Sequence, residues 1–315
     1  MEPENQREES KPSVFEQRVK EYGQAVNQGR DQDAEGLMVE LFTSVAAEAF
    51  ANPSPESVWL EMADQCEQLG NWGAAEDARR KALDLAREHP NRAYPVKFHL
   101  DLGSLYEILG RKEEALAEIK TALELAGESE IPTLIGMALE ANYNTELGQR
   151  NLQGIRAAAK QALEATPGDR IYNTVKLRFL LLQARCAAGL GEFEAAESCV
   201  AAARKLAGDG QQSALISGYP FFRARAAEVA AKIHAACGDF QEAVAAFAEV
   251  VTREREVCAK PHLQGIRSRY RLAQALFTLA DYLEKSAKPA DATVARTEAR
   301  DILGELKLPP IPPKG

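Results

Sequence analysis

The sequence predicts an all-α fold built from repeated helical hairpins. Its 315 residues are 45% hydrophobic, 27% charged and only 7% aromatic, with a surplus of helix-forming alanine, leucine, glutamate and basic residues. Four glycines, Gly70, Gly110, Gly191 and Gly238, each end one helical pattern just before the next begins. This recurrence predicts an array that adds core unit by unit, so we expect one elongated domain.

The first full hairpin, residues 57–90, carries the pattern that the later units repeat. Its first helix follows the spacing W-x2-L-G-x2-Y, and its second has small residues where the two helices approach closely. The residues in this pattern are Trp59, Met62, Ala63, Cys66, Ala75 and Ala82. The hairpin resembles a tetratricopeptide (TPR) unit, and the resemblance implies a right-handed α-solenoid of about seven antiparallel hairpins with a concave binding surface.

The turns favour TPR units over HEAT-like helical repeats. Three of them have a glycine followed two residues later by an aromatic side chain: Gly70-Asn71-Trp72, Gly191-Glu192-Phe193 and Gly238-Asp239-Phe240. The spacing is 40 residues from Gly70 to Gly110 and 47 from Gly191 to Gly238, longer than the ~34 residues of the plain repeat. Such extended helices resemble those of TPR arrays in bacterial signalling and transcription regulators and in adaptor proteins.

The two ends of the chain differ in composition from the array. Residues 1–12 are charged and have little to bury, which predicts a disordered tail. We assign residues 13–308 to the solenoid and interpret residues 13–50, with two weaker apolar stripes, as a degenerate capping hairpin. Residues 309–315 form a proline-rich tail that cannot be helical, and we favour a linker over a polyproline ligand.

The hairpins between the cap and the tail follow in order. After residues 57–90, we expect helix pairs at 94–109 with 112–126, at 171–190 with 193–206, and at 221–237 with 240–257. The last pair is a helix at 262–285 with a second helix that carries Ala292, Ala299 and Ile302. The third hairpin, with a first helix at 132–147, keeps phase only if its turn is longer than the others.

The sequence contains no recognisable catalytic or cofactor motif. Its four histidines lie far apart without the H-E-x-x-H spacing of a zinc site, and no glycine-rich phosphate loop follows a strand. We therefore expect no enzymatic activity, no cofactor and no metal. The five cysteines are scattered without a C-x-x-C pair, which predicts reduced, mostly buried thiols. Without a signal peptide or an apolar run of membrane-spanning length, we expect a cytoplasmic location and no membrane partner.

The charge is uneven along the chain. The net charge is −9, yet residues 168–271 carry 15 basic against 11 acidic side chains, whereas residues 1–92 carry 10 against 19. The overall charge and the lack of basic runs interleaved with aromatic residues argue against nucleic-acid binding. The function classes are an adaptor or scaffold that holds a protein or peptide in its groove, a regulatory or sensor module that self-associates into a homo-oligomer and, least favoured, a nucleic-acid-binding protein.

The TPR resemblance assigns candidate groove residues by their distance from the turn glycines. They are Asp64, Glu67, Asn142, Arg178, Arg185, Arg225 and Lys232. The four cations form two pairs, each seven residues apart on one helix face, so we expect them in one strip. The groove would then be acidic at one end and basic at the other, which suits an acidic segment or a C-terminal carboxylate. The alternative is that these cations pair with Glu228 or Glu197 as a solvated face.

Overall fold

The structure is a computed structural model that describes residues 55–68, 70–87, 93–169, 172–207, 220–259 and 266–308, with scattered residues between 21 and 37. These residues form helices and turns without a strand. The first three hairpins are α3 (Pro55–Gln68) with α4 (Trp72–Arg87), α5 (Ala93–Ile108) with α6 (Lys112–Ser129), and α7 (Pro132–Asn144) with α9 (Leu152–Ala165). The other three are α10 (Asn173–Gly189) with α11 (Phe193–Ala207), α13 (Pro220–Ala236) with α14 (Phe240–Cys258), and α15 (Ile266–Lys285) with α16 (Pro289–Glu305).

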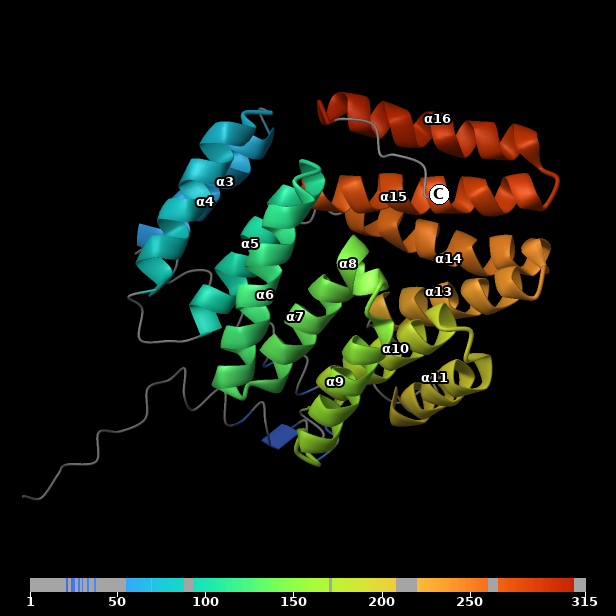
Figure 1. Cartoon of the computed structure of the whole chain (residues 1–315), viewed down its shortest axis with the longest axis horizontal. Helices are drawn as coiled ribbons and strands as arrows, with labels where there is room; N and C mark the ends of the chain where they lie inside the picture. Colours follow the sequence, from blue (N-terminus) through green and yellow to red (C-terminus); the bar gives the residue numbers. More distant parts are fainter. Residues whose placement is uncertain are drawn as a thin grey trace, which may run out of the picture.

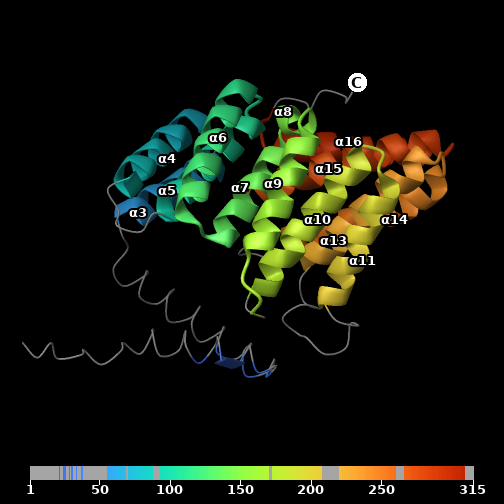
Figure 2. The same cartoon turned by 60° about the horizontal axis from the view of Figure 1, so that its bottom comes forward.

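The hairpins stack in chain order, which confirms the predicted all-α solenoid. Each pair packs along its length, and each hairpin rests on the next (Figure 2). The two tails lie outside the described residues, as does most of the capping hairpin at 13–50, so those assignments stay predictions.

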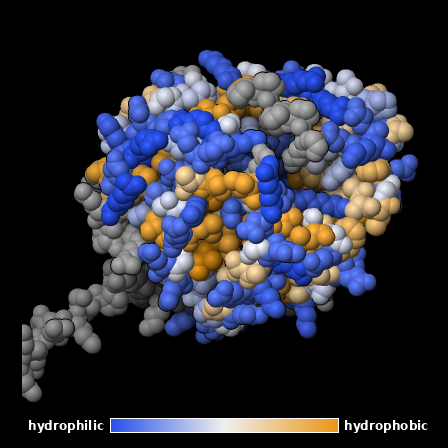
Figure 3. Space-filling view, viewed as in Figure 1, coloured by the Kyte–Doolittle hydropathy of each residue, from blue (hydrophilic) through white to orange (hydrophobic). Residues whose placement is uncertain are grey.

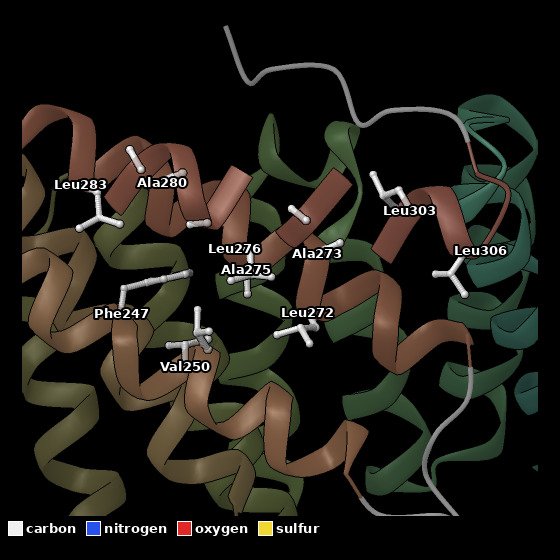
Figure 4. Close-up of a cluster of buried hydrophobic side chains, with 14 of the residues drawn as sticks. Phe247, Val250, Leu272, Ala273, Ala275, Leu276, Ala280, Leu283, Leu303 and Leu306 are labelled. Carbon is white, nitrogen blue, oxygen red and sulfur yellow. The ribbon is translucent and has the colours of Figure 1, made fainter. Parts of the chain in front are cut away.

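The array curves until its last hairpin touches its second, which the sequence did not predict. In α15, Arg267 Nη1 donates to Asp101 Oδ1 of α5 at 2.6 Å, and its Nη2 donates to the Asp101 carbonyl at 3.1 Å. Ile108 at the end of α5 also belongs to the hydrophobic cluster that joins α14, α15 and α16. Figure 4 shows members of this cluster from these three helices. The helices α5, α7, α10, α13 and α15 therefore enclose the inner side of the curve (Figure 1).

The buried core contains the small residues that the sequence pattern singles out. The alanines at the predicted close approaches are all 2% exposed or less: Ala75, Ala82, Ala115, Ala122, Ala196, Ala203 and Ala243. Met62 is different, because its side chain is 45% exposed although it occupies a motif position. The motif thus predicts where the helices of a hairpin meet, but not every contact of the first helix.

The turn glycines have the backbone conformation that their residue type favours. Gly70, Gly110, Gly191 and Gly238 have φ between 72° and 81°, in the left-handed region that an L side chain disfavours. The last hairpin has Ala287 at this place, with φ 61°. Its turn keeps the same hydrogen bonding, since Lys288 N donates to the Leu283 carbonyl at 2.9 Å. Ala287 therefore holds a strained conformation.

Exchanging Ala287 for glycine should stabilise the protein by about 0.5–1 kcal/mol, because glycine adopts a positive φ without a Cβ clash. Urea unfolding followed by circular dichroism measures the change. Gly110→Ala is the matched control, and it should destabilise because its positive φ, rather than crowding, opposes a side chain there. A destabilised Ala287→Gly variant would contradict this description of the last turn.

The third hairpin departs from the predicted boundaries. Its first helix ends at Asn144 rather than at residue 147, and a one-turn helix α8 (Glu146–Gln149) follows. Thr145 causes the break: its backbone is extended, its Oγ1 accepts from Gly148 N at 2.9 Å, and the hydroxyl donates to the Asn142 carbonyl at 2.7 Å. This local bonding fixes the end of α7, next to the candidate site.

Two further expectations are tested by the described residues. All five cysteines are free, as predicted, but only Cys186 is buried, Cys237 is exposed and the others are half-buried. The prediction of mostly buried thiols is therefore wrong. Burial raises the pKa of the Cys186 thiol to about 11. None of the described helices is both long and apolar enough to span a membrane.

Candidate functional site

The four cations of the predicted strip come together on the inner side of the curve. Arg178 and Arg185 lie on α10, and Arg225 and Lys232 lie on α13, the first helix of the next hairpin. The helices α7 and α13 both pack against α10. We call Arg178, Arg185, Arg225 and Lys232 the cation strip.

Two carboxylates bind the cation strip from different helices. Glu228 of α13 lies 3.1 Å from Arg185 Nε, 3.2 Å from Arg225 Nη1 and 3.2 Å from Lys232 Nζ. Glu140 of α7 lies 2.9 Å from Arg225 Nη2, and 3.6 and 3.7 Å from the guanidiniums of Arg185 and Arg178. The pair Glu140 and Arg225 joins the third hairpin to the fifth across the fourth.

Tyr143 of α7 packs against the same cations. The Arg185 guanidinium lies over the Tyr143 ring, 4.0 Å from its centre, and Lys232 Nζ donates to the phenol oxygen at 2.7 Å. Arg185 Nη2 also donates to the Asn144 side chain at 3.2 Å. Glu140, Tyr143 and Asn144 share one face of α7, because they are three and four residues apart.

Burial and neighbouring charges act in opposite directions on the pKa values of Glu228, Arg225 and Lys232, and the charges prevail. Burial alone would raise the pKa of Glu228, but the surrounding cations, Arg185 foremost, hold it well below its usual range. Burial would likewise lower the pKa of Arg225, and the Glu140 and Glu228 carboxylates instead raise it. The same balance, with Glu228 as the main partner, raises the pKa of Lys232. Glu228, Arg225 and Lys232 are therefore charged at neutral pH.

Three of the four cations are more accessible than the carboxylates that bind them, whereas Arg185 is buried. The side chains of Lys232, Arg178 and Arg225 are 29%, 19% and 18% exposed. Glu140 and Glu228 are only 12% and 11% exposed. The part of the cluster that solvent reaches most is therefore positively charged.

The structure brings together only part of the predicted groove set. Asp64 and Glu67 lie on α3, where both accept hydrogen bonds from the buried Arg79 of α4, at 2.6 and 2.7 Å. Asn142 is half-buried on α7, and its main-chain carbonyl accepts from Thr145. These three residues lie apart from the cation strip in the contacts of the described residues. Whether any of the seven binds a partner stays a prediction.

The alternative of simple ion pairing is partly correct. Glu228 does pair with the strip, as one form of that alternative predicted, while Glu197 lies exposed on α11. The pairs do not form a solvated face, however, because Arg185 is 4% exposed and Glu228 is 9% exposed.

The sequence interpretation missed Glu140, Tyr143 and Asn144. One signal was present: Glu140 is the only charged residue of α7, whose sequence is PTLIGMALEANYN. A lone carboxylate in an otherwise uncharged helix indicates a buried partner, because an unpaired buried charge is costly.

No group of three histidine, cysteine or acidic side chains that could hold a metal occurs among the described residues.

Comparisons with known proteins agree with this fold. A family model described as tetratricopeptide repeat matches residues 96–129, which lie in α5 and α6. No curated protein matches the chain in sequence. The solved structure of the apo form of RapI is 13% identical, with a TM-score of 0.53, and the match covers 91% of this chain and 99% of RapI.

Two other solved structures of similar fold contain a bound peptide or factor. A Rap protein complexed with competence and sporulation factor is 15% identical, with a TM-score of 0.52 over 93% of this chain and 77% of that one. NprR in complex with its cognate peptide NprX is 12% identical, with a TM-score of 0.51 over 93% of this chain and 81% of that one. These similarities concern the fold. The family model adds a match to one tetratricopeptide repeat, at residues 96–129.

Proposed function

We propose that this chain is an interaction scaffold that binds an acidic segment of a partner protein, or its C-terminal carboxylate, at the cation strip. The observation that carries the proposal is the gathering of three guanidiniums and one ammonium on the inner side of the solenoid, where Arg178, Arg225 and Lys232 are more exposed than their carboxylate partners. Guanidinium groups bind carboxylates through paired, charge-assisted hydrogen bonds.

The shape and the surface of the array also support binding of a peptide. Curved helical arrays present extended inner surfaces to their partners. In Figure 3 hydrophobic side chains come to the surface near the middle of the molecule, among the hydrophilic ones that cover most of this face. Two proteins of similar fold were solved with a peptide or factor bound. An acidic segment with some apolar side chains matches these features.

The double variant Arg178→Gln with Lys232→Gln tests this function, because these two side chains are the most exposed of the cation strip. Binding of a fluorescein-labelled hexaglutamate with a free carboxyl end is measured by fluorescence anisotropy. Each charge-assisted contact is worth about 1.5–3 kcal/mol, so the dissociation constant should rise at least ~tenfold. Arg185 is a poor choice for this test, because it is buried and its loss should destabilise the fold.

The matched control is Arg223→Gln with Lys160→Gln, which removes the same charge from exposed positions outside the strip. This control should bind the probe almost as the unaltered protein does. Equal weakening in both double variants would show that the probe responds to overall charge, and the proposed site would then be wrong.

A further inference from the structure

Glu140 occupies the cation strip as an external carboxylate would. Its Oε1 lies 2.9 Å from Arg225 and 3.6 Å from Arg185, and its Oε2 lies 3.7 Å from Arg178. One carboxylate thus contacts three guanidiniums on two other helices. The cluster itself therefore shows which ligand chemistry the strip accepts.

Glu140 and Glu228 hold this position in different ways. Glu228 lies on the same helix as Arg225 and Lys232, three residues after one and four before the other, so the helix itself keeps these pairs together. Glu140 reaches the strip from α7, and its bond to Arg225 spans 85 residues. Two of its three contacts exceed 3.5 Å, whereas those of Glu228 range from 3.1 to 3.2 Å. Glu140 is the more weakly held of the two.

We propose that Glu140 is a built-in competitor, whose carboxylate is replaced on the strip by a carboxylate of the bound acidic segment. The inference rests on the proposed function and names its regulation. A ligand with one carboxylate only exchanges one ion pair for another, so it gains little. A segment with several neighbouring carboxylates gains further contacts with Arg178 and Lys232, and the competitor thereby selects for it.

Replacement would also remove one of the contacts between the third hairpin and the fifth, leaving the hydrogen bond from Lys232 to Tyr143. The bond between Glu140 and Arg225 is lost when the ligand enters, so binding and the contact between α7 and α13 are coupled. Only molecules in which Glu140 has left the strip can bind the ligand. The apparent affinity of the unaltered protein is therefore lower when Glu140 occupies the strip in a larger fraction of the molecules.

Three variants test the competitor with labelled hexaglutamate as the probe. Glu140→Gln removes the competing charge, and Glu140→Asp keeps the charge but shortens the side chain, so that it no longer reaches Arg225. Glu228→Gln is the control, because it changes the net charge of the same cluster as Glu140→Gln does. Both Glu140 variants should bind the probe more tightly than the unaltered protein, by ~tenfold for glutamine. The gain in affinity of both Glu140 variants should also exceed any gain in affinity of Glu228→Gln.

Thermal melts show which variants fold, and Glu140→Asp carries the test if Glu140→Gln does not. If Glu140→Asp binds like the unaltered protein while both glutamine variants gain equally, net charge alone explains the effect and the competitor is refuted. The proposed function would stand in that case, provided that Arg178→Gln with Lys232→Gln still loses binding. If the unaltered protein and all variants fail to bind the probe, the function and the competitor fall together.

Discussion

Replacing Arg185 with alanine should lower the free energy of unfolding by about 3–5 kcal/mol, since removing one partner leaves buried carboxylates with less compensation. Arg185 is 4% exposed and contacts both Glu140 and Glu228. Its guanidinium also packs over the Tyr143 ring, so the variant loses packing as well as charge.

Arg223→Ala is the control for this variant. Arg223 also pairs with a glutamate, Glu249, but its side chain is 72% exposed, and surface pairs contribute only ~0–1 kcal/mol. Urea unfolding followed by helical circular dichroism compares the two. Similar losses in both variants would show that the cluster around Arg185 is no more important to stability than a surface ion pair.

Ala243→Trp should destabilise the protein by about 3 kcal/mol, at the upper end of what overpacking normally causes. Ala243 is 0% exposed on α14, at a position where the sequence pattern requires a small residue. The strain should separate α14 from α13, so both the melting temperature and the helical signal should fall.

Ala245→Trp offers a matched control two residues along the same helix. Ala245 is exposed, so a tryptophan there meets solvent rather than α13. The free energy of unfolding of Ala245→Trp should differ from that of the unaltered protein by less than about 0.5 kcal/mol. If Ala243→Trp melts like Ala245→Trp, the close approach of the two helices in this hairpin is wrong.

The hairpins were predictable because their signals are local. A glycine marks a turn because only the left-handed conformation closes it, and the four turn glycines all have positive φ. Alanines mark the places where two helices approach closely, because a larger side chain would not fit between them. The predicted end of the first helix in the third hairpin is wrong, because the side-chain hydrogen bonds of Thr145 end this helix and no turn glycine marks the position in the sequence. The turn at Ala287 shows that the preferred residue can also be absent.

The cations of the candidate site were predictable from the sequence, but their partner on α7 was not. Helical spacing places Arg178 with Arg185 and Arg225 with Lys232, and the structure brings these pairs together. Their partner Glu140 could not be assigned, because it is 85 residues from Arg225 and meets it only through the curvature of the array. Curvature accumulates from small rotations between units, which a single hairpin sequence does not reveal.

The contact between the last and second hairpins has the same origin. Arg267 and Asp101 are 166 residues apart, and nothing in either helix pattern indicates the other. The predicted acidic end of the groove is also altered by this contact, because the positive charge of Arg267 lies close enough to interact with Glu67 and Asp64. The inner surface is thus set by the curvature as much as by the residues on each helix.

We propose that the cation strip receives the carboxylates of an acidic segment. A crystal structure of the protein with hexaglutamate tests it most directly, since the position of each ligand carboxylate is then observed. We predict a ligand carboxylate within hydrogen-bonding distance of Arg178 or Lys232, with Glu140 turned away from Arg225. A peptide bound elsewhere, with the contacts of Glu140 unchanged, would contradict the claim.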